Sequence, residues 1–253
     1  MSQAIEKAPL TEQDQKRYHR QMMIGGWGEE GQEKLKTAKV FVAGAGGLGS
    51  PASIYLAVAG VGHITICDFD SPDLSNLNRQ ILHSDLRIGT NKAVSAQITL
   101  KELNPSIEVV GLSTRIEPEN VDELVGDAAI IVDCMDNFPT RYVLNECALR
   151  KGIPFVHGSV WGLEGKLTFI HAPETPCFQC LFPTAPPRVV FPVLGATPGT
   201  IGCLQAMETV KYLTGVGDTL KSRMLIWDGA DMEFLVCPIA KNPECPVCGE
   251  PRG

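Results

Sequence analysis

The stretch SNLNRQ, residues 75–80, combines side chains that could hold an anion. It contains two asparagines, a glutamine and Arg79, and it follows an apolar run that ends in several aspartates. A plain turn would favour Gly, Pro or Asp at these positions. Lys92 follows in GTNKA, so a second cation stands nearby in the chain. Fixed cations of this kind stabilise phosphate groups, and a pair of solvated surface charges is the simpler alternative.

The segment GAGGLG, residues 44–49, has the spacing of a phosphate-binding glycine turn. An apolar run precedes it and a run of small residues follows, as expected for a strand, a turn and a helix. Gly44 and Gly46 would let the backbone approach a phosphate at the positive end of that helix. Asp68 ends the next apolar run, where a carboxylate receives ribose hydroxyls. The combination predicts a nucleotide site rather than a tight turn beside a solvated acid.

Asp136 lies in CMDN, directly after a further apolar run. The carboxyl ends of parallel strands meet at one edge of a sheet, so this carboxylate is expected near the phosphates. Mg²⁺ prefers such oxygen ligands and bridges phosphates, which makes Asp136 a candidate magnesium ligand. A helix N-cap is the structural alternative. Together, Arg79, Lys92 and Asp136 favour a triphosphate over a dinucleotide, because a triphosphate concentrates more negative charge.

Four of the nine cysteines form two C-x₂-C pairs. The pairs are Cys177 with Cys180, and Cys245 with Cys248. Four thiolates at this spacing suit a tetrahedral Zn²⁺, and a closed site of this kind would serve stability only. A redox pair is the alternative, but neither pair opens a helix after a strand, as a reactive pair would.

The elements that must position these residues follow from the alternation of strand and helix signals. They predict an α/β fold with a Rossmann-like, mostly parallel sheet and helices on both faces, followed by a C-terminal antiparallel extension with a zinc site. Strands are expected at 39–44, 63–70, 107–113, 128–136 and 154–160. A single domain over 1–253 would comprise a helical arm (1–36), a nucleotide-binding core (37–160) and an antiparallel lobe (161–253). Five prolines mark residues 181–200 as an irregular crossover loop.

Composition narrows the class of protein. The 253 residues carry a net charge of −7, so neither a nucleic acid nor a membrane surface is an expected partner. No apolar run reaches the roughly 18 residues that a membrane helix needs. The first 20 residues are polar and mixed in charge, unlike a secretory signal. These features predict a cytoplasmic protein whose cysteines are thiols or metal ligands.

In combination, these segments resemble the MoeB/ThiF (HesA) family of ubiquitin-activating-like adenylyltransferases. The resemblance covers residues 10–249 and rests on the ordered set RYHRQ, GAGGLG, DFDSPDLSNLNRQ, GTNKA, DCMDN, PCFQC, GCLQAMETVKYLTG and CPVCG. It implies a Rossmann-like ATP-binding core, a homodimer and structural zinc held by the two cysteine pairs. It also implies that MgATP is used to adenylate the C-terminal Gly of a small ubiquitin-like sulfur carrier ending in Gly-Gly.

The resemblance assigns roles to individual residues as well. It implies that the ATP site is lined, beside the glycine turn, by Gly47, Asp68, Ser75, Asn76, Arg79, Lys92, Asp136 and Asn137. It further implies that Arg20 reaches the triphosphate of the other subunit. The residues expected to carry catalysis are then Arg20, Arg79, Lys92 and Asp136.

A cysteine that many relatives carry in the crossover loop is missing from this chain. None stands between Cys180 and Cys203, and Arg188 lies about where that thiol would be. We therefore expect adenylation without a covalent step on this loop. Cys203 is expected at a helix start, where a thiolate is favoured, although a packed residue is the preferred interpretation. Three cysteines in apolar patterns are expected to be inert: Cys67, Cys134 and Cys147.

Other polar and aromatic residues are expected to be structural. His157 is interpreted as a hydrogen-bonded residue at a strand end. Trp161, Trp227 and Phe234 are expected in the core rather than in a groove for the carrier.

The predicted function is ATP-dependent adenylation of a carrier's terminal carboxylate, for sulfur transfer of the molybdopterin or thiamin type. The protein would supply position and charge rather than a side-chain nucleophile. Within the same class, the alternative is adenylation of a peptide or another carboxylate. From a different class, the alternative is a nucleotide-binding scaffold that docks a carrier without turnover. An NAD-dependent enzyme is a more distant alternative.

Overall fold

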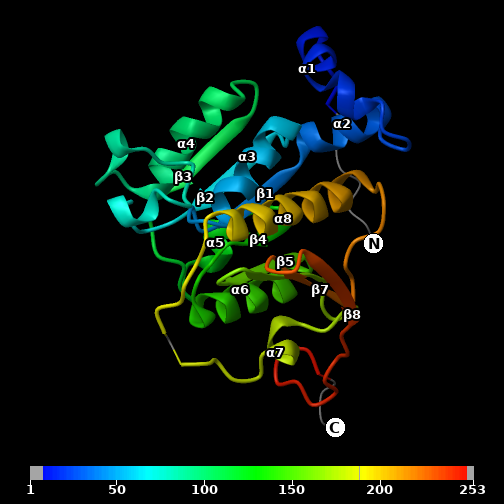
Figure 1. Ribbon diagram of the computed structural model, residues 1–253. Coiled ribbons are helices and arrows are strands. Elements are labelled where there is room, and N and C mark those ends of the chain that lie inside the picture. The colour runs from blue at the N-terminus through cyan, green and yellow to red at the C-terminus, as the bar shows by residue number, and fades with distance from the viewer. Residues whose placement is uncertain (1–7, 188, 250–253) are drawn as a thin grey trace.

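A single mixed sheet forms the centre of the molecule, as seen in the computed structural model, which describes residues 8–187 and 189–249. Its strand order is β3-β2-β1-β4-β5-β6-β7-β8 (Figure 1). The strands are β1 Lys39–Ala43, β2 His63–Cys67, β3 Glu108–Leu112, β4 Ile130–Asp133, β5 Phe155–Trp161, β6 Glu164–Ile170, β7 Arg223–Asp228 and β8 Glu233–Pro238. Strands β1 to β5 pair in parallel, and β6 to β8 extend the same sheet antiparallel to it.

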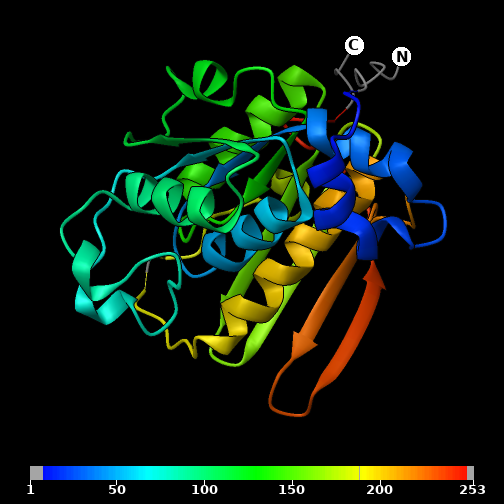
Figure 2. The ribbon, with the colours of Figure 1, turned by 90° about the horizontal axis from the view of Figure 1, so that it is seen from above.

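Helices cover both faces of the parallel part, which confirms the predicted fold class. One face carries α3 Gly49–Ala59, α4 Lys92–Leu103 and α8 Ala196–Thr214. Figure 2 shows α3 and α8 side by side on this face. The other face carries α5 Val121–Val125 and α6 Phe138–Lys151, with the short α7 Phe178–Leu181 beside α6. Two 3₁₀ turns follow β2, at η1 Leu74–Asn76 and η2 Asp85–Arg87.

The sheet is buried on both sides because its parallel strands are almost wholly apolar. Phe41 of β1 and Ile131 of β4 are fully buried, and Leu56 of α3 packs into the core from the other side. Each such side chain contributes about 1.5–3 kcal/mol relative to an exposed position. Parallel strands with helices on both faces need this continuous apolar pattern.

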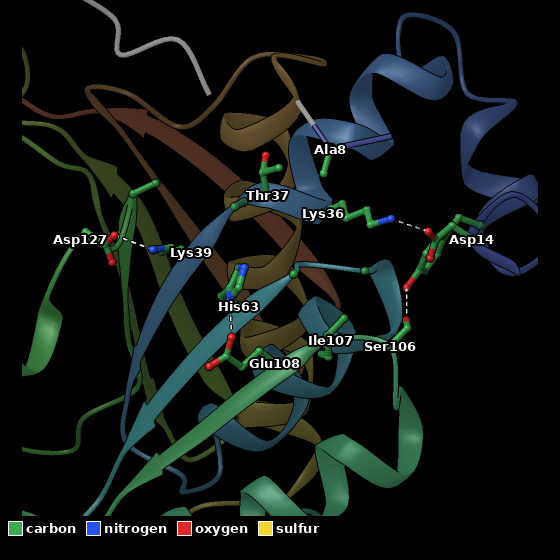
Figure 3. A pocket seen from close by; sticks show the side chains of 15 residues that line it. Ala8, Asp14, Lys36, Thr37, Lys39, His63, Ser106, Ile107, Glu108 and Asp127 are labelled. Atoms are coloured by element: carbon green, nitrogen blue, oxygen red, sulfur yellow. Dashed lines mark hydrogen bonds and ion pairs between the residues drawn. The ribbon is translucent and has the colours of Figure 1, made fainter. Parts of the chain in front are cut away.

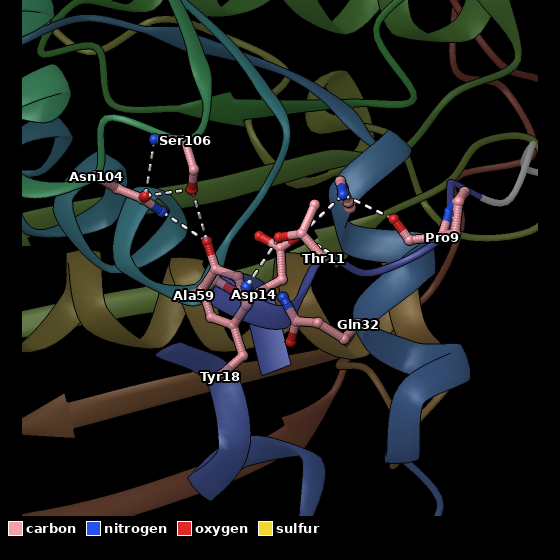
Figure 4. A network of polar contacts seen from close by, with 9 residues as sticks. Pro9, Thr11, Asp14, Tyr18, Gln32, Ala59, Asn104 and Ser106 are labelled. Atoms are coloured by element: carbon pink, nitrogen blue, oxygen red, sulfur yellow. Dashed lines mark hydrogen bonds and ion pairs between the residues drawn. The ribbon is translucent and has the colours of Figure 1, made fainter. Parts of the chain in front are cut away.

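The N-terminal arm consists of α1 Glu12–Met22 and α2 Gly28–Thr37. Thr11 and Asp14 form a capping box at the start of α1. Tyr18 is buried and accepts a 2.8 Å hydrogen bond from Asn104 (Figure 4). Asn104 also donates to the Ala57 carbonyl at the C-terminal end of α3. These contacts fasten the arm to the amino edge of the sheet.

A cavity of about 900 Å³ opens at this same amino edge (Figure 3). Its charged side chains pair with one another: Asp14 with Lys36 at 2.8 Å, Lys39 with Asp127 at 2.5 Å, and His63 with Glu108 at 3.0 Å. Lys39, His63 and Glu108 are the first residues of β1, β2 and β3. The cavity therefore lies opposite the strand ends that carry the predicted nucleotide motifs.

Two aromatic residues differ from the expectation that they belong to the core. Trp161 is 53% exposed and Phe234 is 55% exposed, whereas Trp227 is buried as expected. Trp161 lies at the end of β5, where its ring stacks on Phe191 of the crossover segment. Phe234 lies on β8, the edge strand of the hairpin that projects from the molecule in Figure 2. Both expectations were wrong because apolar patterns show neither where a strand extends past the core, as β5 does at Trp161, nor which strand lies at an edge, as β8 does.

The irregular crossover segment is shorter than the predicted range 181–200, because α7 extends to Leu181 and α8 begins at Ala196. Its end is fixed next to the 75–80 segment. A Cβ on Gly195 would lie 2.3 Å from the Asn78 carbonyl oxygen, so the two backbones are in close contact.

Within the part of the chain that the structure describes, no helix combines the length and apolar character needed to cross a bilayer.

Candidate nucleotide site and metal centre

The predicted nucleotide motifs lie at the point where the strand order reverses. The parallel strands follow the order 3-2-1-4-5, so β1 and β4 are neighbours although β2 and β3 separate them in sequence. Their register pairs Ala43 with Asp133, and the Cys134 amide donates to the Ala43 carbonyl at 2.9 Å. Ligands of doubly wound sheets bind outside the carboxyl ends of the strands at such a point.

The glycine turn joins β1 to α3 in a space that excludes side chains. Gly44 has φ +99°, and a Cβ there would lie 2.8 Å from the Cys134 carbonyl oxygen. A Cβ on Gly49 would lie 2.0 Å from the Gly44 carbonyl oxygen. The neighbouring positions Gly46 and Gly47 are less crowded, with a Cβ on Gly47 meeting Pro198 at 3.2 Å. Free N–H groups at the start of α3 and this bare backbone suit a phosphate.

Asp68 follows β2 and points at this turn. Its Oδ2 accepts a 2.8 Å hydrogen bond from the Ala45 amide, and its Oδ1 accepts one from the Asp70 amide at 2.9 Å. Burial raises the pKa of Asp68 despite these hydrogen bonds. Each carboxylate oxygen keeps a lone pair, so Asp68 can still receive ribose hydroxyls, as predicted.

His83 supports the same turn and was not identified from the sequence. Its Nε2 lies 2.8 Å from the Ala45 carbonyl oxygen and its Nδ1 lies 2.9 Å from Ser95 Oγ. Burial lowers the pKa of His83, so the ring is neutral, with Nε2 donating to Ala45 and Nδ1 accepting from Ser95. A lone histidine in RQILHSD carries no motif that would have revealed this role.

The two predicted cations, Arg79 and Lys92, lie beside the glycine turn and Asp68. Arg79 lies beside Gly47, since a Cβ there would be 3.5 Å from Arg79 Cγ. Its Nη1 donates to the Ser75 carbonyl at 3.0 Å and to the Asn78 side chain at 2.9 Å. Through these bonds, the SNLNRQ segment folds into a loop that holds the side chain of Arg79 in place.

Lys92 is the first residue of α4 and is 8% exposed. Its Nζ lies 3.6 Å from Asp70 Oδ2. The preceding Asn91 caps α4 and donates to the Asp68 carbonyl at 2.9 Å. Lys92 is therefore held directly beside Asp68.

Ser75 and Asn76 lie in η1 and present polar atoms on the surface of this edge. Ser75 Oγ donates to Asp73 Oδ1 at 2.6 Å, and the Asn76 carbonyl accepts the Gln80 amide at 3.0 Å. Asp73 also caps η1 through the Ser75 amide. The segment is thus ordered by its own hydrogen bonds.

Asp136 lies exposed in the loop between β4 and α6. Asn137, not Asp136, is the N-cap of α6, because its Oδ1 accepts the Thr140 amide at 3.0 Å. The structural alternative for Asp136 is therefore wrong. No hydrogen bond or ion pair from the described residues reaches the Asp136 carboxylate, which leaves both oxygens available for a metal ion.

Arg20 is not brought to this site within one chain. It is exposed on α1, where no described residue pairs with it. The neighbouring Gln21 donates to the Ala59 carbonyl at the C-terminal end of α3, whereas the glycine turn precedes the N-terminal end. An α-helix of 11 residues is about 16 Å long. Arg20 is thus separated from its own glycine turn by the length of α3.

The two C-x₂-C pairs meet in one cluster, with all four sulfurs within 4.8 Å of one another. The Sγ–Sγ distances are 3.6 Å for Cys177–Cys245, 3.4 Å for Cys180–Cys248 and 3.9 Å for Cys177–Cys180. Four thiolates about 2.3 Å from a tetrahedral ion would lie about 3.8 Å apart, so the cluster fits such an ion. The distances are too long for disulfides.

Four of the five cysteines outside the cluster give no sign of a reactive thiol. Cys67, Cys134 and Cys147 are buried, and burial raises the pKa of each, as expected for inert core residues. Cys203 does not lie at a helix start: it is the eighth residue of α8, and burial raises its pKa too. Arg188, at the position of the missing loop thiol, lies outside the described residues.

A doubly wound sheet with a glycine turn, a carboxylate bound to that turn and two cations at its switch point defines an α/β protein of the nucleotide-binding class. Residues 18–247 match the ThiF family, and the chain belongs to this family. The resemblance inferred from the ordered motifs is thereby confirmed.

Similar proteins share most of the chain. It is 45% identical to the SAMP-activating enzyme E1 of Haloferax volcanii, over 92% of this chain and 88% of that protein. It is 40% identical to the sulfur carrier protein adenylyltransferase of Thermus thermophilus, over 95% of this chain and 93% of that protein. It is also 43% identical to the adenylyltransferase and sulfurtransferase MOCS3-1 of Zea mays, of which it spans 52%.

Solved structures of Escherichia coli MccB share the fold. The complex with MccA-N7isoASN matches with a TM-score of 0.84 over 92% of this chain and 75% of that chain, at 22% identity. The complex with ATP matches with a TM-score of 0.83 over 92% and 73%, at 23% identity. At this level of identity the likeness establishes the architecture alone.

Proposed function

We propose that this protein is an ATP-dependent adenylyltransferase that activates the C-terminal Gly carboxylate of a small ubiquitin-like sulfur carrier. The products are an acyl-adenylate and pyrophosphate. The observation that carries the proposal is the convergence of Asp68, Arg79 and Lys92 on one glycine turn, with Asp136 on the neighbouring strand end. The names of the Haloferax and Thermus relatives support an activating enzyme for a carrier protein.

The chemistry needs position and charge more than a nucleophilic side chain. Asp68 receives the ribose hydroxyls, and the glycine turn accepts the phosphates against bare backbone. A carboxylate oxygen of the carrier attacks the α-phosphorus, and the bond to the bridging oxygen of the β-phosphate breaks. Arg79 and Lys92 stabilise the charge that develops on the departing pyrophosphate.

Asp136 is the residue proposed to hold Mg²⁺. Its carboxylate has no partner among the described residues and lies in the loop that follows β4, the strand next to β1 and its glycine turn. When bound there, Mg²⁺ would neutralise part of the charge of the phosphate groups. Asn137 follows as a helix cap, so its backbone position is fixed beside the nucleotide.

The proposed working form is a homodimer in which Arg20 serves the site of the other subunit. Its position at the far end of α3 from the glycine turn supports action in trans rather than in cis.

The ion proposed for the sulfur cluster is Zn²⁺, which suits four thiolates and leaves no open position, so its role is structural. A cytoplasmic location belongs to the same proposal, because free thiols persist in a reducing compartment.

Adenylation of a peptide carboxylate is a weaker alternative that rests on the fold shared with MccB alone. A scaffold without turnover is not favoured, because a carboxylate and two cations fixed around a phosphate turn would have no purpose in docking.

The test is pyrophosphate exchange into ATP with purified protein, Mg²⁺ and candidate carriers that end in Gly-Gly. Exchange should require both the carrier and its free terminal carboxylate. The matched control is the same carrier lacking its last glycine. If the protein binds the nucleotide but shows no exchange with any carrier or peptide, the proposed enzymatic activity is contradicted. The non-catalytic docking scaffold would then be the remaining alternative.

A further inference from the structure

A buried charged cluster lies beneath the loop that carries Asp136. It consists of Asp133 at the end of β4, Arg141 on α6 and His157 on β5, which are 0%, 5% and 1% exposed. Asp133 Oδ2 lies 2.6 Å from His157 Nδ1 and 3.2 Å from Arg141 Nε. Asp133 is the first residue of the DCMDN segment, whereas Arg141 and His157 lie outside the ordered motifs.

The cluster holds Met135, the residue before Asp136, at both its amide N–H and its carbonyl oxygen. Asp133 Oδ1 accepts a 3.0 Å hydrogen bond from the Met135 amide. Arg141 Nη2 donates to the Met135 carbonyl and, at 3.1 Å, to the Gly158 carbonyl. Asp133 thus fixes the amide nitrogen of Met135, and Arg141, which pairs with Asp133, fixes its carbonyl oxygen.

The backbone after Asp136 is fixed as well, because Asn137 caps α6 through the Thr140 amide. The result is a residue whose two neighbours are both immobilised while its own carboxylate is exposed and unpaired within the described chain. A metal ligand benefits from this arrangement, since a fixed backbone limits the positions that the carboxylate oxygens adopt.

His157 completes the cluster from the other side of Asp133. Burial lowers its pKa, so the ring is neutral, and the 2.6 Å contact places its proton on Nδ1. Nε2 is buried without a hydrogen-bond partner among the described residues, and the ring packs against Phe178 and Phe182 at centroid distances of 4.9 and 5.7 Å. His157 therefore has one polar function, which is to donate to Asp133.

Stability alone is a poor explanation for this cluster. Replacing a buried ion pair by packed apolar residues is often neutral or stabilising, because both charges must be removed from water. The hydrogen bonds to Met135 give the pair a different purpose, since they set the path of the loop at the nucleotide edge.

We propose that Asp133, Arg141 and His157 are positioning residues that hold Asp136 where it receives the magnesium ion of the nucleotide complex. The proposal rests on the proposed function, because it assigns the ion to Asp136. His157 acts indirectly, because it donates a hydrogen bond to Asp133. Asp133 and Arg141 fix Met135, and Met135 in turn sets the position of Asp136.

The test measures binding of Mn²⁺, as a probe for Mg²⁺, to the full-length protein saturated with a non-hydrolysable ATP analogue. Free Mn²⁺ is followed by its paramagnetic resonance signal. His157→Phe removes the donor to Asp133 and should weaken Mn²⁺ binding about 10-fold, the lower end of what outer-shell partners of metal sites contribute. His157→Asn keeps an amide nitrogen near the Nδ1 position and should restore most of the affinity.

Arg141→Lys is the second variant, because it keeps the charge opposite Asp133 but loses the forked contacts to two carbonyls. It should also weaken Mn²⁺ binding while leaving metal-free binding of the ATP analogue unchanged. Asn104→Ala is the matched control, since it breaks a buried polar network at the opposite edge of the sheet. It should lower the melting temperature without changing Mn²⁺ affinity.

Wild-type Mn²⁺ affinity in both His157→Phe and Arg141→Lys would overturn the positioning role and leave the proposed function intact. Equal weakening in Asn104→Ala would overturn it too, because the effect would then follow from general loss of stability. Absence of nucleotide-dependent Mn²⁺ binding in the wild type would instead contradict the metal site at Asp136 itself.

Discussion

The carboxylate of Asp68 and the backbone amide of Ala45 are joined by a hydrogen bond of 2.8 Å. This bond connects the acid after β2 to the glycine turn after β1, so two motifs that are separate in sequence form one structural unit. The residue proposed to receive the ribose thus also fixes the backbone proposed to receive the phosphates. A change at Asp68 should therefore disturb both parts of the nucleotide.

Asp136→Ala should abolish Mg²⁺-dependent pyrophosphate exchange without unfolding the protein. The carboxylate is exposed and has no partner in the described chain, so the free energy of unfolding should change by less than about 0.5 kcal/mol. Loss of the proposed Mg²⁺ ligand should lower the exchange rate by at least about 100-fold, the scale of removing one charge-stabilising group at a reacting centre. Exchange kinetics and thermal denaturation measure the two effects. Undiminished exchange would remove Asp136 from the mechanism.

Mixing an Arg20→Ala subunit with an Asp68→Ala subunit should restore activity that neither homodimer has. In the mixed dimer, the site with intact Asp68 receives Arg20 from the other subunit, and one of the two sites works. Pyrophosphate exchange of the mixture is compared with that of each variant alone. If heterodimers form, as shown by differential tagging, and exchange stays at background, Arg20 does not act in trans.

Protein purified without added metal should contain about one Zn²⁺ per chain, as four clustered thiolates predict. Cys245→Ser should release the ion and lower the free energy of unfolding by about 3 kcal/mol, because the metal joins the C-terminal segment to α7. Elemental analysis and denaturant unfolding measure these changes. Cys237→Ser, on β8 outside the cluster, is the control and should keep its zinc. Full stability in the metal-free protein would refute the assignment.

Gly49→Ala and Gly199→Ala should change stability in opposite directions. A Cβ on Gly49 would lie 2.0 Å from the Gly44 carbonyl oxygen, so the turn must shift, at a cost of about 1–3 kcal/mol. A Cβ on Gly199 in α8 meets nothing within 4 Å, and alanine should stabilise the helix by up to about 1 kcal/mol. Urea unfolding gives both values, and ATP binding should weaken only in Gly49→Ala. A stable, ATP-binding Gly49→Ala variant would contradict the packing of the turn.

Cys203→Ser should leave adenylate formation unchanged. Burial raises the pKa of Cys203, so the thiol stays protonated at neutral pH and is a poor nucleophile. Pyrophosphate exchange should equal that of the wild type, and non-reducing gels should show no thiol-sensitive conjugate with the carrier in either protein. A conjugate that forms with the wild type and disappears in Cys203→Ser would place an active thiol on α8.

The strand and helix alternation and the ordered motifs were sufficient to predict the fold class and the family. Periodicity encodes which elements form, and the glycine turn, Asp68 and Lys92 each lie at a fixed offset from a strand or helix end. Caps are equally local features, because they depend on neighbouring residues only: Thr11 and Asp14 cap α1, and Gly152 ends α6.

The sequence by itself therefore determined the elements, the motif residues at strand ends and the four thiols of the cluster. Only the tertiary structure decided that Trp161 and Phe234 are exposed, that His83 supports the glycine turn, and that Asp133, Arg141 and His157 form one buried cluster. The physical reason is that burial and hydrogen bonding of such side chains depend on strand order and sheet edges. Those are set by contacts between residues far apart in the chain, which a local pattern does not encode.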